Sequence, residues 1–356
     1  MGQRKRDIWL LGRHVKIFWS AGGIVGLRSA SVRRIYKELN GLSDTLKVTR
    51  DDVLAAARRI ADEVESTPLI ETRILGHAVW LKCESLQTGG AFKLRGATNR
   101  LVQLSAAERA RGVVAFSSGN HALGVARAAQ RLGIAATVVM PSDAPTLKID
   151  GTRALGAEVV LYDRRRDNRE AIAARIAEES GATVVPSFDD VHIVAGQGTV
   201  GLDLIEQMAE PPRRIVIPCG GGGLAAGIAL ACPDAEIFIV EPEGWDDMKR
   251  SLEGGIIVPV EVDAPPTLCD ALQTPLVSPI TFDILRSRDA TALAVSEAEV
   301  AAAVRWAWHE HQLTVEPGGA VTIAALLAGK VDVVAGTVAI VSGGNIDPAL
   351  HARLVA

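Results

Sequence analysis

Short apolar, β-prone runs alternate with longer segments of helical periodicity along most of the chain. Seven such runs follow one another: 113–117 (VVAFS), 136–141 (ATVVMP), 157–162 (AEVVLY), 183–187 (TVVPS), 214–219 (RIVIPC), 236–241 (EIFIVE) and 337–342 (TVAIVS). Segments such as ALGVARAAQRLG and NREAIAARIAEESG lie between them and space their apolar residues along one helical face. This alternation predicts an α/β fold with mostly parallel strands and helices on both faces.

The regular pattern begins near residue 49. There TRDDVLAAARRIADEV has helical spacing, with Thr49 and Asp52 placed as a capping pair. The first 40 residues differ, because they hold nine Lys or Arg against two acidic residues. We therefore predict a basic N-terminal extension over 1–44. Disorder, a transit peptide, a membrane-surface segment and sequence translated upstream of the true start are its open interpretations.

Composition narrows the functional classes. The 356 residues, 48% of them hydrophobic, suffice for two domains with sizeable cores. A net charge of −4 gives no overall basic field and argues against a nucleic-acid partner. No apolar run reaches the ~18 residues of a membrane span. The four cysteines show neither a C-x-x-C pair nor metal-ligand spacing with histidine, which favours a reducing cytoplasm over a disulfide framework or a zinc site.

One lysine has unusual neighbours. The stretch ESLQTGGAFKLRGAT (84–98) places Lys93 after a β-prone run at 78–81 and before a helical segment with Leu94, Ala97 and Leu101 on one face. At such a strand, loop and helix junction, the backbone N–H groups that begin the helix favour an anion. A buried lysine there can lose its proton and attack a carbonyl carbon. Lys93 is a candidate Schiff-base lysine, with an ordinary surface lysine as the alternative.

Polar or glycine motifs follow four of the predicted strands, namely SSGNH (117–121), GGGG (220–223), EPEGWDD (241–247) and SGGN (342–345). Ligands bind beyond the carboxyl ends of parallel strands, so these motifs predict a shared site. The glycine run can bring backbone N–H groups close to a phosphate. It also fits a dinucleotide fingerprint through Gly221, Gly223 and Ala226, with Glu241 after the next strand. An NAD-dependent oxidoreductase is therefore a second hypothesis.

A set of motifs resembles one enzyme family in order and spacing: ESLQTGGAFKLRGA, SSGNHALGVA, GQGT (196–199), PCGGGGLAAG, EPGGA (316–320) and SGGNID (342–347). The chain resembles the threonine and serine dehydratases, with serine racemase close by, which are pyridoxal-phosphate enzymes of the tryptophan synthase β fold. The resemblance runs from about residue 45 to the end. It implies a large domain of 45–111 and 191–356, an inserted small mobile domain of 112–190, a cofactor between them, and a homodimer.

The resemblance implies a role for each cofactor-binding position. Lys93 matches the lysine that holds pyridoxal phosphate, Phe92 would lie against the ring, and Asn120 would bond its phenolic oxygen. The other implied cofactor contacts are Gly220, Gly221, Gly222 and Gly223 at the phosphate, Glu316, and Ser342 at the pyridine nitrogen. Ala91 stands where the family usually has Ser, and Leu123 where it usually has Gln. These departures bear on fine positioning.

The implied reaction is dehydration of L-threonine or L-serine to a 2-oxo acid and ammonia by a pyridoxal-phosphate-dependent ammonia-lyase. The freed Lys93 amine would remove the α-proton. Ser117, Asn120 and His121 would hold the substrate carboxylate, and Arg169 would receive the second carboxylate of a hydroxyaspartate. Ser118 would supply an acid or base on the opposite face, as racemisation requires. Serine racemase, 3-hydroxyaspartate ammonia-lyase and a non-catalytic binding protein are the alternatives.

The EPEGWDD motif predicts a divalent-cation site. Glu241 and Asp247 are six residues apart on a loop after a strand. With the backbone carbonyl of Trp245 and water, these carboxylates would suit Mg²⁺. The positions match the metal site of serine racemase, and a solvated acidic loop is the alternative.

Overall fold

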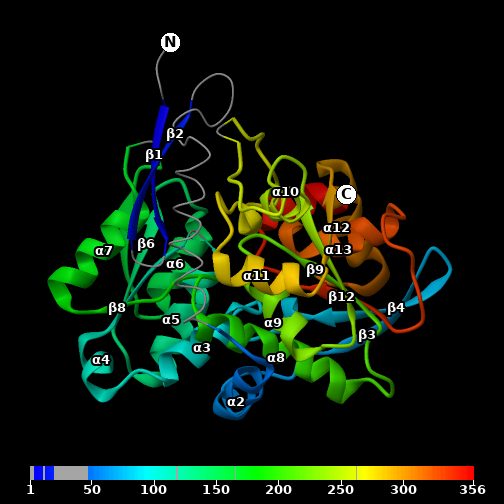
Figure 1. Cartoon of the computed structure of the whole chain (residues 1–356), viewed down its shortest axis with the longest axis horizontal. Helices are drawn as coiled ribbons and strands as arrows, with labels where there is room; N and C mark the ends of the chain where they lie inside the picture. The colour runs from blue at the N-terminus through cyan, green and yellow to red at the C-terminus, as the bar shows by residue number, and fades with distance from the viewer. Residues whose placement is uncertain (1–3, 11–12, 20–46, 118, 165, 262) are drawn as a thin grey trace.

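The computed structural model describes residues 4–10, 13–19, 47–117, 119–164, 166–261 and 263–356. Over these ranges the chain forms two sheets of mainly parallel strands, each with helices on both faces (Figure 1). Near the N-terminus, β1 (Arg4–Leu10) pairs with β2 (Arg13–Trp19) in a separate antiparallel hairpin. Within the described residues, no helix has the length and apolar composition needed to cross a bilayer.

The larger sheet has the strand order β11-β10-β9-β12-β4-β3, and only the β3–β4 pairing within it is antiparallel. Its strands are β3 (Leu69–Ile74), β4 (His77–Cys83), β9 (Arg214–Pro218), β10 (Glu236–Pro242), β11 (Thr291–Val295) and β12 (Thr337–Val341). Alternate side chains point to opposite faces, so Ile215 and Ile217 pack into one core cluster and Val216 into the other.

Two helical layers cover this sheet. One layer is α2 (Arg50–Ile60), α8 (Val191–Gln207), α9 (Gly223–Ala231), α10 (Asp247–Gly254) and α11 (Pro279–Ser287). The other is α12 (Glu297–His311), α13 (Pro317–Leu327) and α14 (Pro348–Val355). The predicted cap of the first helix is confirmed, because Thr49 and Asp52 exchange side-chain and backbone hydrogen bonds at the start of α2.

The smaller sheet has the order β7-β6-β5-β8 with all pairings parallel. Its strands are β5 (Val113–Phe116), β6 (Ala136–Pro141), β7 (Glu158–Tyr162) and β8 (Thr183–Val184). Helices α3 (Lys93–Val102), α5 (Asn120–Leu132) and α6 (Thr146–Ala154) cover one face, α7 (Arg169–Ser180) covers the other, and α4 (Ala106–Arg111) leads into β5. Because α3 contributes Leu94, Ala97 and Leu101 to this core and also packs on α8, it lies between the two bodies.

The predicted α/β fold with mostly parallel strands is confirmed, and all seven apolar runs contribute strands. The run at 183–187 gives only the two residues of β8. Pro186 has no N–H to continue the ladder, and the Ser187 carbonyl accepts a hydrogen bond from Lys93 instead. The edge strands β3 and β11 are not among the predicted runs.

Candidate active site

A cavity of about 510 Å³ opens between the two bodies at the carboxyl ends of their strands. The smaller body contributes the loops after β5 and β8 and the start of α7. The larger body contributes the glycine loop before α9, the short helix η2 (Asp270–Leu272) with the segment after it, and the single residues Glu316 and Ser342. The motifs that the sequence predicted to share a site therefore converge, apart from the acidic motif after β10.

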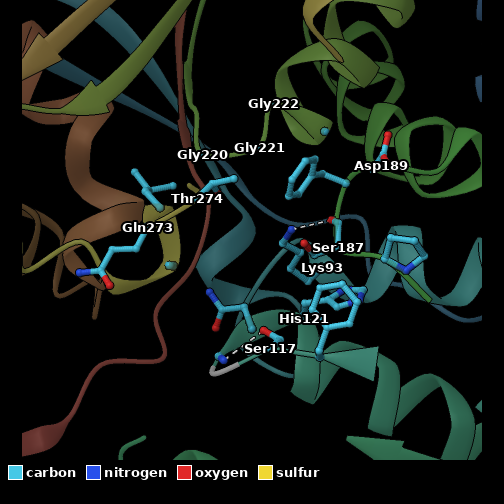
Figure 2. A pocket seen from close by; sticks show the side chains of 18 of the residues that line it. Lys93, Ser117, His121, Ser187, Asp189, Gly220, Gly221, Gly222, Gln273 and Thr274 are labelled. Carbon is cyan, nitrogen blue, oxygen red and sulfur yellow. Dashed lines mark hydrogen bonds between the residues drawn. The ribbon is translucent and has the colours of Figure 1, made fainter. Parts of the chain in front are cut away.

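Lys93 is the first residue of α3, and its amine points into the cavity between the glycine loop and Ser117 (Figure 2). Its Nζ donates a hydrogen bond of 2.9 Å to the Ser187 carbonyl and lies 5.1 Å from the centroid of the Phe92 ring. Burial lowers the pKa of Lys93 to about 8. A useful fraction of the amine is thus unprotonated near neutral pH and can act as a nucleophile or a base.

The glycine loop connects β9 to α9, which begins at Gly223. A Cβ on Gly221 would lie 2.3 Å from the Phe188 ring, and one on Gly220 would lie 3.0 Å from the Thr274 hydroxyl oxygen. Gly222 has a φ of +83°, in the left-handed region that favours glycine. Bare backbone at a helix N-terminus is suited to binding a phosphate, so these residues fit a phosphorylated cofactor.

Asn120 and Glu316 bring the two bodies together beside the cavity. The Asn120 amide donates to Glu316 Oε1 and accepts a hydrogen bond of 2.9 Å from the Asn345 amide. Glu316 Oε2 has no hydrogen-bond partner among the described residues, and burial raises the pKa of Glu316 to about 7. Nearby, the carbonyl of Ser342 accepts a hydrogen bond of 3.2 Å from the backbone amide of Phe92. An unpartnered oxygen at the cavity wall leaves Glu316 free to contact a bound group.

The loop after β5 and the start of α5 carry Ser117, Asn120 and His121, which the sequence predicted to bind the substrate carboxylate, and all three line the cavity. The Ser117 hydroxyl accepts a hydrogen bond of 3.2 Å from the Gly119 amide, while Ser118 lies outside the described residues. The His121 ring places Nε2 2.9 Å from the Val185 carbonyl, and Nδ1 has no partner among the described residues. Burial, followed by the positive charge of Lys93, lowers the pKa of His121 to about 3. His121 is therefore neutral, and because its Nε2–H donates to the Val185 carbonyl, its Nδ1 can only accept a hydrogen bond.

Arg169 lines the cavity from the start of α7. Its Nε lies 2.9 Å from Glu170 Oε1, and its guanidinium carbon lies 5.6 Å from the centroid of the Phe116 ring. Burial alone would lower the pKa of Arg169, but the Glu170 carboxylate offsets it and leaves the pKa above its ordinary value. A permanent cation thus faces the cavity beside one acidic partner.

Glu241 and Asp247 are both fully buried, and neither lines the cavity. The Glu241 carboxylate accepts hydrogen bonds from the backbone amides of Met248 (3.1 Å) and Lys249 (2.8 Å) in α10. The backbone N–H groups of Asp247 itself and of Val277 lie near the Asp247 carboxylate and favour its charged form. Neither carboxylate oxygen, however, receives a well-aligned hydrogen bond. Burial raises the pKa of both carboxyls. The alternative of a solvated acidic loop is therefore wrong for these two side chains.

A metal site here would depend on these two carboxylates and on backbone or water oxygens. Among the described residues, no group of three or more His, Cys, Asp or Glu side chains is placed to hold an ion. Trp245 donates its backbone amide to the Pro242 carbonyl (3.0 Å) and its indole N–H to the Pro265 carbonyl (2.8 Å). Both N–H groups of Trp245 are thereby hydrogen-bonded, one within the loop and one to Pro265 in a separate segment.

Sequence reasoning missed part of the cavity wall. Phe188 lies against the glycine loop, and the segment 270–276 lines the wall near Thr274. Phe188 follows a predicted strand end, so the rule that led to the other motifs could have identified it. The segment 270–276 has little regular structure and no recognisable motif, so nothing in the sequence indicated it.

Comparisons with known proteins identify the family of the chain. A family model described as pyridoxal-phosphate dependent enzyme matches residues 60–343. An L-threo-3-hydroxyaspartate ammonia-lyase from a Pseudomonas species is 42% identical, covering 85% of this chain and 97% of that protein. An L-threonine ammonia-lyase from Thermotoga maritima is 41% identical, with 86% and 78% covered. The structure of maize serine racemase matches with a TM-score of 0.81 at 32% identity, covering 86% of this chain and 96% of that one. The chain belongs to the family of pyridoxal-phosphate-dependent enzymes.

Proposed function

We propose that this enzyme is an ammonia-lyase that dehydrates a small hydroxy amino acid, with L-threonine and L-serine as the first candidates. The observation that carries the proposal is Lys93, whose amine of lowered pKa lies in a cavity that also contains a glycine loop at a helix N-terminus. The ammonia-lyase relatives of about 40% identity support this reaction class. A nicotinamide cofactor has less support, because Glu241 is committed to the backbone of α10 and does not face the cavity.

The residues fit pyridoxal phosphate, which when bound supplies the electron withdrawal that acidifies the substrate α-carbon. We assign its covalent attachment to Lys93 and its phosphate to the backbone of Gly220–Gly223. The ring would lie among Phe92, Asn120, Glu316 and Ser342, all of which line the cavity. A Ser342 hydroxyl is a weaker partner for a pyridine nitrogen than a carboxylate would be, which suits elimination.

Residues of the chain transfer the proton and bind the substrate. The Lys93 amine takes the α-proton, as its lowered pKa permits. The segment of Ser117, Asn120 and His121 binds the substrate carboxylate through its N–H groups and side chains, with His121 contributing its backbone N–H because its ring N–H is bonded to Val185. We further propose that residues 112–190 move as a small domain over the large domain of 45–111 and 191–356, which would exclude water during the reaction.

An assay of 2-oxo acid and ammonia release tests the proposal. The holoenzyme would be incubated with L-threonine, L-serine, D-serine and both diastereomers of 3-hydroxyaspartate. Stoichiometric release from L-threonine or L-serine is the expected result. Release from none of the five would refute the proposed function. Chiral chromatography of the L-serine sample would reveal D-serine if racemisation, with Ser118 as the second acid or base, accompanies elimination.

Arg169 favours 3-hydroxyaspartate as a second candidate substrate, because its cation faces the cavity and could pair with a second carboxylate. We expect Arg169→Ala to lower kcat/KM for 3-hydroxyaspartate by about 10- to 100-fold, the effect of losing one charge-assisted hydrogen bond. The value for L-serine should change little. Arg175→Ala, at an exposed position on the same helix, is the matched control. Equal losses for both substrates in Arg169→Ala would count against this role.

We also propose that Glu241 and Asp247 bind a divalent cation with oxygen ligands, including the Trp245 carbonyl. Asp247→Asn tests the site with little disturbance, since the Asp247 oxygens lack hydrogen bonds whereas Glu241 caps α10. Addition of Mg²⁺ or Ca²⁺ at ~100 times its Kd should stabilise the wild type by about 2.7 kcal/mol. The same addition should leave the Tm of Asp247→Asn unchanged, and an unchanged wild-type Tm would exclude the site.

The pH dependence of stability checks the same carboxyl without metal. In the folded chain the pKa of Asp247 is raised, so the native state retains a proton that the unfolded chain releases. Because the native state then binds more protons, the free energy of unfolding should fall as pH rises from the ordinary carboxyl range towards neutrality. Asp247→Asn should remove this part of the decline in chelator-treated protein.

A further inference from the structure

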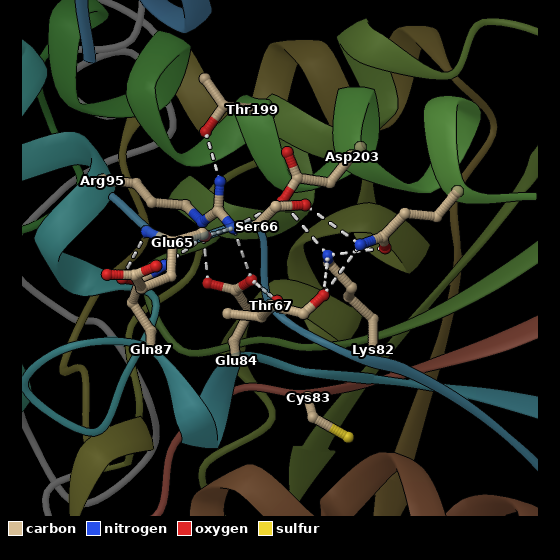
Figure 3. Close-up of polar contacts among 12 residues, drawn as sticks. Glu65, Ser66, Thr67, Lys82, Cys83, Glu84, Gln87, Arg95, Thr199 and Asp203 are labelled. Atoms are coloured by element: carbon tan, nitrogen blue, oxygen red, sulfur yellow. Dashed lines mark hydrogen bonds and ion pairs between the residues drawn. The ribbon is translucent and has the colours of Figure 1, made fainter. Parts of the chain in front are cut away.

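A buried cluster of charged and polar side chains surrounds Arg95 (Figure 3), and none of its members lines the cavity. At its centre, the Arg95 guanidinium is 1% exposed and bonds both oxygens of the fully buried Glu84 at 2.8 and 2.9 Å. It also bonds Asp203 Oδ2 at 2.7 Å and the Thr199 hydroxyl at 3.2 Å, both on α8. We call these four side chains the Arg95 cluster. It joins Glu84, the residue that follows β4, to the first turn of α3 and the middle of α8.

The Arg95 cluster holds one geometry because each contact constrains a different direction. The two-pronged contact with Glu84 fixes the plane of the guanidinium. Burial alone would lower the pKa of Arg95, but the charges of Glu84 and Asp203 and their hydrogen bonds together outweigh it and raise the pKa above its ordinary value. A buried ion pair gives little net stability compared with well-packed apolar residues. Its clearest physical consequence here is therefore the position that it imposes on α3.

The start of α3 needs such an anchor. The helix has no side-chain cap, and the residue before it is fixed by a 3.2 Å hydrogen bond from the Phe92 amide to the Ser342 carbonyl. One turn later, the Gly96 amide donates to Gln197 of α8 at 3.1 Å, and a Cβ on Gly96 would lie 2.9 Å from the Ile193 carbonyl. Gly96 thus sets how closely α3 approaches α8, and the Arg95 cluster sets the orientation of the first turn.

Residues two apart on a helix point to nearly opposite sides. Lys93 accordingly extends into the cavity while Arg95 extends into the cluster. We propose that Arg95 and Glu84 are positioning residues, which hold the first turn of α3 so that the Lys93 amine meets the bound cofactor and the substrate α-carbon. This inference rests on the proposed role of Lys93.

Lys82 provides an internal comparison within the same buried region. Its Nζ bonds Asp203 Oδ2 at 3.1 Å, Gln207 Oε1 at 2.9 Å and the Thr67 carbonyl at 2.8 Å, and among the described residues it makes no hydrogen bond or ion pair with α3. If Lys82 is replaced by methionine, Asp203 keeps Arg95, and the Thr67 carbonyl keeps a 3.0 Å hydrogen bond from Gln207. Lys82→Met thus removes a buried charge beside the Arg95 cluster without releasing α3.

The test compares Arg95→Lys, Glu84→Gln and Lys82→Met as holoenzymes whose unfolding free energies have been measured. We expect the first two to lower kcat by about 10- to 100-fold, as for a catalytic group displaced by ~1 Å, with KM nearly unchanged. A loosened α3 also lets water reach Lys93 and relieves the burial that lowers its pKa. The acidic limb of the kcat profile should therefore move to higher pH. Lys82→Met should have the kcat of the wild type, and the acidic limb of its kcat profile should lie at the same pH as in the wild type.

Two outcomes would overturn the inference. One is a wild-type kcat and pH profile in both Arg95→Lys and Glu84→Gln, and the other is a loss in Lys82→Met equal to theirs at equal stability. If the wild type turns over no hydroxy amino acid, the proposed function fails separately. The inference is then decided by the fraction of protein whose Lys93 carries the cofactor at a fixed pyridoxal phosphate concentration. That fraction should fall in Arg95→Lys and Glu84→Gln only, and an unchanged fraction in both would refute the inference.

Discussion

Replacing Lys93 with alanine is expected to remove both the covalent attachment of the cofactor and turnover. The lysine supplies the amine for attachment and the base for α-proton removal, and loss of a general base alone costs about 10²- to 10⁴-fold. Removing an amine whose pKa is lowered by burial should not weaken the fold. The purified variant should therefore lack the visible absorption band of the attached cofactor, with a Tm equal to or above that of the cofactor-free wild type.

Lys330→Ala is the control for this prediction, since Lys330 bonds Glu299 and the Ala294 carbonyl and does not line the cavity. This variant should retain the visible absorption band of the attached cofactor and the turnover rate of the wild type. Full turnover by Lys93→Ala would contradict the proposed mechanism as a whole.

Gly221→Ala should have the next largest effect, by weakening cofactor binding. The added Cβ would lie 2.3 Å from the Phe188 ring, so either the ring or the loop must shift. Overpacking of this kind costs about 1–3 kcal/mol. If the strain falls on the bound form, the Kd for pyridoxal phosphate rises by about 10- to 100-fold. This Kd is measured by titrating the cofactor-free protein with pyridoxal phosphate and following the absorbance.

Gly254→Ala is the matched control, because its Cβ would meet only Ile256 Cγ1 at 3.9 Å, an ordinary contact. Its Kd should equal that of the wild type. Wild-type affinity in Gly221→Ala would mean that the glycine loop does not form the phosphate site.

The strands were well predicted where an apolar run in the sequence coincides with a position in the middle of a parallel sheet. The apolar runs at 136–141 and 214–219 are buried on both faces, as a parallel sheet requires, and both form strands. The edge strands β3 and β11 of the larger sheet were missed, because each lacks a run of buried apolar residues. In β3 the run LIETRI mixes polar and apolar residues and has only Ile74 buried, so it gives no strong apolar signal.

The candidate site was predictable to the extent that its residues follow strand ends. Lys93, Asn120 and Gly221 do so, and the structure brings them to one cavity. Side-chain partnerships over long sequence separations were not predictable. Nothing local to Arg95 indicates that it meets Asp203, which lies 108 positions further along the chain.

The most direct test of the central claim is to locate the cofactor on the chain. The holoenzyme would be reduced with borohydride, digested and analysed by mass spectrometry, so that the lysine carrying the pyridoxyl group is identified. We expect this lysine to be Lys93, in the peptide that contains AFKLRGA. A pyridoxyl group on any other lysine, or no modified lysine in a protein saturated with pyridoxal phosphate, would contradict it.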